Sequence, residues 1–169
     1  MGDRTRIEWT DATWNPIRGC SRVSEGCRNC YAERMAARFS GPGRPYEDLV
    51  RRTPHGPRWT GEVRLVEELL DAPLHWRRPR RIFVNSMSDL FHEAVPDEWI
   101  DKVFAVMALA EHHTFQVLTK RPERMLRYLT DLPKRAANTP ALPTRRVPYE
   151  DSRICEFLAQ EGGADGATD

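Results

Sequence analysis

Apolar residues in the middle of this chain alternate between short continuous runs and helical stripes. Residues 62–65 (EVRL), 81–86 (RIFVNS) and 114–118 (TFQVL) have the length of strands, and the last two are typical of buried strands. Between 96 and 108, apolar residues recur every three or four positions, and a second stripe follows Pro122, so both segments are predicted helices. Residues 66–76 are expected to form one helix or two short ones.

This alternation predicts an α/β fold, because a helix carries the chain back between parallel strands. We expect about three strand–helix units in a partial (β/α) barrel-like parallel sheet, after an N-terminal cysteine loop. Residues 1–30 are predicted to be that extended loop, 31–39 a helix, and 40–59 a long loop with at most a short helix. The expected domain covers 1–132. A proline-rich linker at 133–148, a short helix at 149–160 and a disordered tail are expected to follow it.

Composition limits the function classes. A chain of 169 residues with 40% hydrophobic residues can form one domain with a core. The formal net charge of +1 argues against a bulk polyanion binder. Residues 77–81 (RRPRR), the one candidate for a local basic stripe, are expected to be a solvated loop, with a nucleic-acid contact as the alternative. No run approaches the ~20 apolar residues of a membrane span, and no apolar signal segment opens the sequence, so we expect a cytoplasmic protein.

Three of the four cysteines lie close together in the sequence. Cys20, Cys27 and Cys30 have the spacing Cys-x6-Cys-x2-Cys, while Cys155 is remote and is expected to be a bystander. Thiolates are soft ligands that suit zinc or iron–sulfur clusters. A structural zinc site needs a fourth ligand, such as Cys155 or His92. Three cysteines on a [4Fe–4S] cluster instead leave one iron open for a substrate or cofactor. Three ordinary free thiols are the remaining interpretation.

Three blocks of the sequence carry a resemblance: IEWTDATWNPIRGCSRVSEGCRNCYAERMA, IFVNSMSDLFHEAVPDEWI and TFQVLTKRPERM. Together they resemble a phage- and bacteria-associated family named after the phage gene products thirty-seven and sixty-eight, which is similar to the radical S-adenosylmethionine (SAM) proteins. The resemblance runs from about Thr5 to Met125. It implies a partial or full (β/α) barrel, a [4Fe–4S] cluster on the three clustered cysteines, and SAM bound at the open iron through its amino and carboxylate groups.

Two features depart from the wider radical SAM pattern. The common spacing there is Cys-x3-Cys-x2-Cys, and many relatives have an aromatic residue just before the third cysteine, whereas Tyr31 follows it here. The resemblance therefore implies cluster binding more strongly than radical catalysis.

Polar side chains follow two of the predicted strands. Ser86, Ser88 and Asp89 come after the strand at 81–86, and Lys120 follows the one at 114–118. In (β/α) barrels the working residues gather at the carboxyl ends of the strands. The two serines and Asp89 are candidates to hydrogen-bond the amino group or ribose of the cofactor, and Lys120 to bind a carboxylate or phosphate. Helix capping by Asp89 and a solvated Lys120 are the alternatives.

The sequence therefore supports three functional hypotheses. The first is an iron–sulfur protein of radical SAM type acting on nucleic acid or another phage-related substrate. The second is a zinc-stabilised binding module without turnover. The third is an inactive truncated remnant, because a complete eight-unit barrel needs at least ~200 residues. A partner protein that supplies the missing part of the barrel would also account for this length. The catalytic residues and the oligomeric state are left open.

Overall fold

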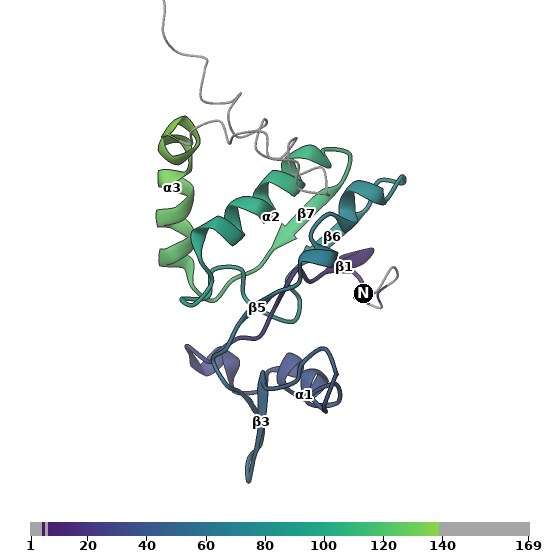
Figure 1. Ribbon diagram of the computed structural model, residues 1–169, viewed down its shortest axis with the longest axis vertical. Helices are drawn as coiled ribbons and strands as arrows, with labels where there is room; N and C mark the ends of the chain where they lie inside the picture. The colour runs from purple at the N-terminus through teal and green to yellow at the C-terminus, as the bar shows by residue number, and fades with distance from the viewer. Residues whose placement is uncertain (1–4, 6, 139–169) are drawn as a thin grey trace, which may run out of the picture.

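Three short strands form a parallel sheet in the upper part of the molecule as drawn in Figure 1. The computed structural model describes residue 5 and residues 7–138. Strands β1 (Ala12–Trp14), β6 (Arg81–Val84) and β7 (Thr114–Val117) pair in the order β1-β6-β7, and both pairings are parallel. The predicted α/β fold with a parallel sheet is confirmed, and the strands within the described residues do not close a barrel.

One face of this sheet packs against two long helices, α2 (Asp97–Leu109) and α3 (Pro122–Asn138). Both start where the apolar stripes predicted, with Pro96 as the cap of α2 and Pro122 as the first residue of α3. Apolar side chains from the three strands and both helices form one core, and burying each large one stabilises the fold by roughly 1.5–3 kcal/mol. The largest that are almost fully buried include Trp14, Phe91, Ile82, Ile100 and Val103.

The first strand of the sheet is not the predicted one. Residues 62–65 were expected to open the sheet, but β5 (Arg64–Leu65) pairs antiparallel with β2 (Ile17–Arg18) in a separate two-stranded sheet. The first strand of the parallel sheet is instead β1, which lies inside the segment predicted to be a loop. A strand of three residues is too short to show a hydrophobic period, so only its pairing with β6 reveals it.

A hairpin and a helix make up the lower part of the molecule (Figure 1). Strands β3 (Val50–Thr53) and β4 (Gly56–Trp59) pair antiparallel, where the sequence predicted a loop with at most a short helix. That prediction is wrong because these strands carry arginine and proline instead of alternating apolar residues. Helix α1 (Tyr31–Ala37) ends two residues before its predicted end. A second hydrophobic cluster joins α1 to the hairpin through Ala32, Ala36, Tyr46, Leu49 and Trp59.

Residues 66–76 form two short 3₁₀ helices, Glu67–Leu69 and Ala72–His75, which is one of the two arrangements expected for this segment. Helix α3 continues through Pro133 to Asn138, so the expected linker does not begin at 133; the rest of the predicted linker, the helix at 149–160 and the tail lie outside the described residues. No helix in the described part of the chain has the length and apolar character that crossing a membrane requires.

Candidate metal centre

The cysteine loop begins beside the segment that follows β6. Gly19 forms a parallel bridge with Ser88, which brings the start of the loop to the carboxyl end of the sheet. Its φ of +92° lies in the left-handed region, and a Cβ there would overlap the backbone carbonyl oxygen of Glu62. Only glycine therefore fits this approach without strain. Cys20, Cys27 and Cys30 are all free thiols within this loop, and Cys30 caps α1.

Asp89 is a buried junction between the ends of two strands. One carboxylate oxygen accepts hydrogen bonds from the Phe91 N–H at 3.0 Å and the Thr119 hydroxyl at 2.7 Å. The other accepts from the Lys120 N–H at 3.1 Å and from the Arg121 guanidinium at 3.0 Å. The carboxylate thus fixes its own turn, although no helix begins there for it to cap, and also ties the end of β6 to the end of β7.

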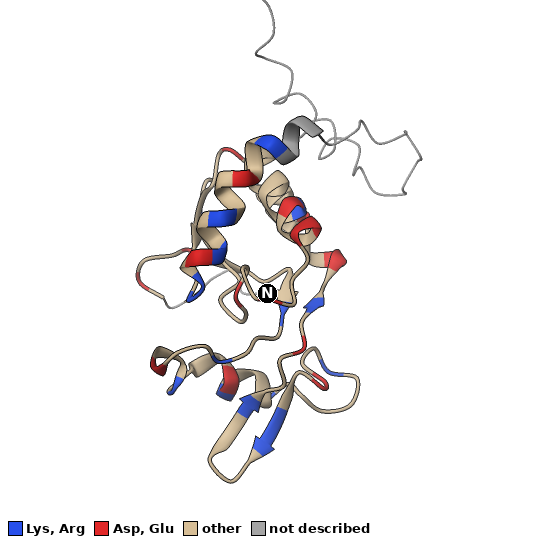
Figure 2. Ribbon diagram, turned by 90° about the vertical axis from the view of Figure 1, so that its left-hand side faces the viewer, with Lys and Arg blue, Asp and Glu red and all other residues tan. Residues whose placement is uncertain are grey.

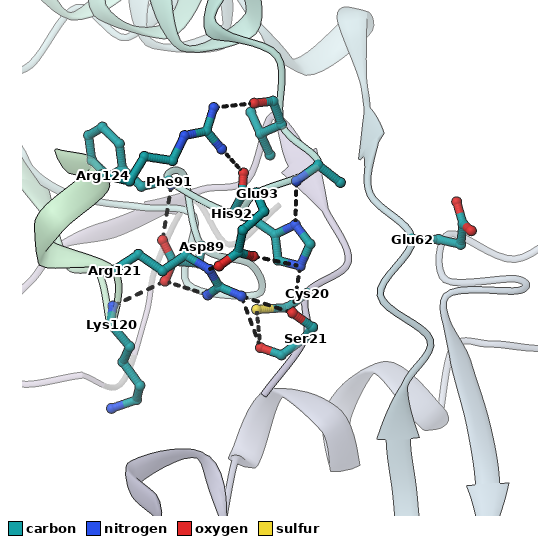
Figure 3. Close-up of polar contacts among 12 residues, drawn as sticks. Cys20, Ser21, Glu62, Asp89, Phe91, His92, Glu93, Lys120, Arg121 and Arg124 are labelled. Atoms are coloured by element: carbon teal, nitrogen blue, oxygen red, sulfur yellow. Dashed lines mark hydrogen bonds and ion pairs between the residues drawn. The ribbon is translucent and has the colours of Figure 1, made fainter. Parts of the chain in front are cut away.

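Arg121 connects this junction to the cysteine loop (Figure 3). Its side chain is only 5% exposed, and it donates to Asp89, to Glu93 Oε1 at 2.8 Å, and to Ser21 Oγ at 2.9 Å and O at 3.3 Å. Ser21 directly follows Cys20, so one guanidinium holds three loops together. A planar group with five fixed donors suits such a position better than lysine would.

His92 contacts the same serine. Its Nδ1 accepts the N–H of Ala94 at 3.1 Å, so in the neutral ring the proton sits on Nε2, which lies 2.8 Å from Ser21 Oγ and donates to it. Burial, and secondarily the positive charge of Arg121, lowers the pKa of His92 and favours this neutral form. Both ring nitrogens are therefore engaged within the protein, which disfavours His92 as a fourth zinc ligand.

Each clustered thiol lies near a different basic side chain. Burial raises the pKa of Cys20 to about 11, while Arg121 acts in the opposite direction. Burial would also raise the pKa of Cys27, but hydrogen bonds from the loop and the charge of Lys120 outweigh it and lower that pKa. Arg22 lies within electrostatic reach of Cys30 and, more weakly, of Cys27. The loop therefore carries three thiols and is flanked by three cations, of which Arg22 is paired with Glu33 and Arg121 with Asp89 and Glu93.

Lys120 points at the cysteine loop. A Cβ added to Gly26 would stand 3.2 Å from Lys120 Nζ, so the glycine leaves room for the ammonium group. Within the described residues, no hydrogen bond or ion pair engages this ammonium; the backbone N–H of the same residue is the group that binds Asp89. Lys120 is thus the predicted site residue whose charged group is left available to a ligand.

The predicted serines have protein partners. Ser86 Oγ donates to Asn15 Oδ1 at 3.1 Å, and Ser88 Oγ donates to the Ile17 carbonyl oxygen at 2.9 Å. Asn85, with a left-handed φ of +55°, accepts the Ile17 N–H at 3.3 Å, and its buried Nδ2 has no partner among the described residues. These side chains therefore join the end of β6 to Asn15 and β2, the segment that leads from β1 to the cysteine loop.

The donor set fits an iron–sulfur cluster in its chemistry. Among the described residues, no three His, Cys, Asp or Glu side chains converge closely enough to hold a single metal ion. A [4Fe–4S] cluster makes a different demand, because its cysteine sulfurs bind separate irons. Three free thiols from one loop are the donors that such a cluster needs.

The structure brings the cysteine loop and the predicted cofactor-binding residues to the carboxyl end of the parallel sheet. Ser88 lies beside the start of the cysteine loop, Asp89 is tied to it through Arg121, and Lys120 lies against it at Gly26. Sequence reasoning missed Arg121 and Ser21. Arg121 was detectable in principle, because it directly follows Lys120 at a predicted strand end. Ser21 carried no comparable signal.

Comparison with known proteins places the chain in one family. A family model described as "Protein of unknown function (DUF5131)" matches residues 4–149. Neither the curated proteins nor the solved structures contain a match to this chain.

Proposed function

Because the chain belongs to the DUF5131 family, whose function is unknown, we propose a function from its own residues: an iron–sulfur protein of radical SAM type with a [4Fe–4S] cluster on Cys20, Cys27 and Cys30. The observation that carries the proposal is a loop with three free thiols beside the Lys120 ammonium, which no carboxylate among the described residues neutralises. Three thiolates concentrate negative charge, and this ammonium offsets part of it.

The bound cluster would supply one-electron chemistry and an open iron position for a ligand with amino and carboxylate groups. The chain's own residues have distinct roles around it. Arg121 and Asp89 hold the backbone beside Cys20, and the Lys120 ammonium is placed to bind a carboxylate. Ser86 and Ser88 each donate their hydroxyl proton within the protein, to Asn15 and to Ile17, and would accept a hydrogen bond from the amino group or ribose of the cofactor through a remaining lone pair.

A partial (β/α) barrel is the finer fold that we propose. Helices cover the sheet face that carries Trp14 and Val84, as they cover the outside of a barrel. The opposite face carries the aligned residues Thr13, Phe83 and Gln116, which are partly exposed. Strands β1 and β7 are the outer strands of this sheet, so further strands, including those of a partner protein, would pair there.

Anaerobic reconstitution with iron and sulfide tests the cluster. We expect about four irons and four sulfides per chain and a broad absorption in the visible blue. Cys27→Ala loses this signal, whereas the matched control Cys155→Ala, which removes the thiol outside the loop, retains it. Circular dichroism of both variants checks the fold. Equal iron content in the two variants refutes the ligand assignment, and one bound zinc without iron supports the zinc module instead.

Binding of SAM is measured separately on the reconstituted chain by equilibrium dialysis. Lys120→Met is expected to weaken binding by about tenfold, because a charge-assisted hydrogen bond contributes roughly 1.5 kcal/mol. Lys102→Met is the matched control, since Lys102 lies on α2 beside Glu67 at 3.9 Å, away from the loop. Equal affinities for the two variants would exclude the assigned role of Lys120.

A further inference from the structure

Positive charge is concentrated in the part of the chain that contains the cysteine loop, α1 and the hairpin. Residues 18–64, here called the basic segment, hold five acidic residues against ten arginines: Arg18, Arg22, Arg28, Arg34, Arg38, Arg44, Arg51, Arg52, Arg58 and Arg64. The whole chain has a formal net charge of only +1, so the remainder is acidic on balance. Figure 2 shows blue positions on both strands of the hairpin, at the end of the molecule away from the parallel sheet.

The hairpin contains an unfavourable pair. Arg51 in β3 stands directly opposite Arg58 in β4, and like charges at opposed positions of an antiparallel pair destabilise it. The nearby acid is Glu33, whose Oε2 lies 3.7 Å from Arg58 but 2.6 Å from Arg22. One carboxylate therefore serves two guanidinium groups, and the charge of Arg51 is left without a counterpart.

The neighbouring Arg52 is in the same situation. Arg51 and Arg52 are both exposed, and within the described residues their guanidinium groups form no ion pair or hydrogen bond. Successive residues of a strand point to opposite faces, so the two arginines flank the hairpin. Arg58 is tied instead to the cysteine loop through Glu33, whose carboxylate pairs with both Arg58 and Arg22. Two arginines without a counterion, one on each face of a strand, suit an extended anion with regularly spaced charges.

We propose that the β3–β4 hairpin binds the phosphate backbone of a nucleic acid through Arg51 and Arg52. This inference is independent of the cluster. Guanidinium groups bind phosphate oxygens in a fork geometry, and the strand arrangement fixes where they stand. The run at 77–81, the candidate basic stripe that was expected to be a solvated loop, is partly engaged within the protein: Arg81 pairs with Asp11 at 3.1 Å, and Arg80 stacks over the Trp76 ring at 4.9 Å.

Fluorescence anisotropy on the full chain tests the proposal. The probes are a labelled 20-nucleotide single strand and a 20-base-pair duplex, each titrated between 50 and 200 mM salt. For duplex DNA, Arg51→Ser/Arg52→Ser is expected to reduce the slope of log affinity against log salt by about 1.8, since each lost phosphate contact removes about 0.9. The ratio of the affinity of the unmodified chain to that of the variant then falls roughly tenfold between 50 and 200 mM salt. For the single strand, the expected reduction of this slope is about 1.4.

Two further variants make the result specific. Arg77→Ser/Arg78→Ser removes the same charge from exposed residues of the other basic run and is expected to keep the slope. Arg51→Lys/Arg52→Lys keeps the charge and is also expected to keep the slope. The thermal midpoint of Arg51→Ser/Arg52→Ser should not fall, because the substitution relieves the repulsion with Arg58.

Three outcomes would overturn the proposal. The first is an equal loss of affinity in the two serine double variants, which would mean that only total charge matters. The second is an equal reduction of the salt slope in the lysine and serine variants of the hairpin, which would mean that the two positive charges do not contact phosphates. The third is competition by polyglutamate of the same charge as effectively as by DNA, which would indicate a general acidic partner.

Discussion

Replacing Arg121 with methionine tests the buried network on which the site rests. The substitution keeps much of the side-chain volume but removes the donors to Asp89, Glu93 and Ser21. Asp89 is the critical partner, because the two side chains are only 5% and 8% exposed. The carboxylate of Asp89 then stays buried without its cation.

The expected loss of unfolding free energy depends on which hydrogen-bond donors Asp89 loses and which it keeps. Removing one partner of a buried ion pair costs about 3–5 kcal/mol, because the other charge is left uncompensated. Asp89 retains donors from Phe91, Thr119 and Lys120, which offset part of this cost, so we expect about 3 kcal/mol. Glu93 contributes little to this value, since its side chain is 64% exposed.

Urea unfolding followed by tryptophan fluorescence measures the change. With a slope of about 1–3 kcal/mol per molar urea, the midpoint of Arg121→Met should fall by roughly 1–3 M. Arg81→Met is the matched control, because the Arg81–Asp11 pair is about half exposed, with side-chain exposures of 51% and 47%, and its midpoint should remain near that of the unmodified chain. Similar midpoints for the two variants would refute the claim that Arg121 holds the three loops together.

Three other substitutions test separate features in the same unfolding assay. Gly19→Ala should destabilise the chain by about 2 kcal/mol or more, because its left-handed φ and the nearby Glu62 carbonyl oxygen exclude a Cβ; an unchanged midpoint would contradict this. Glu33→Gln should cost about 2–3 kcal/mol, since Glu33 is 2% exposed and its charge is shared by two arginines, and a value below about 1 kcal/mol would count against it. Burial lowers the pKa of His113, so the unfolded state takes up its proton first as the pH falls below about 6.5. Stability should therefore fall from pH 7 to pH 5, less steeply in His113→Gln, and identical pH dependence in the two chains would refute the assignment.

The elements that the sequence predicted well are those with a long apolar period. The two helices that begin near Pro96 and Pro122 were located because each has several turns over which apolar residues recur. Strand β1 and the β3–β4 hairpin were missed because these residues form strands through pairing with another strand and show no apolar period of their own. A strand of three residues, or one whose opposed positions are both arginine, has no pattern of its own to detect.

The candidate site divides in the same way. The sequence by itself identified the candidate ligands: three cysteines of fixed spacing in a glycine-containing loop, and polar residues after two buried strands. Thiol chemistry and strand ends are local properties, so they can be recognised without a fold. Only the tertiary structure decided that Gly19 meets Ser88, that Arg121 joins Asp89 to Ser21, and that Lys120 faces Gly26. The members of each pair are far apart in sequence, so their contacts are set by packing. At Asp89 and Arg121, burial also removes the water that would otherwise satisfy each charge.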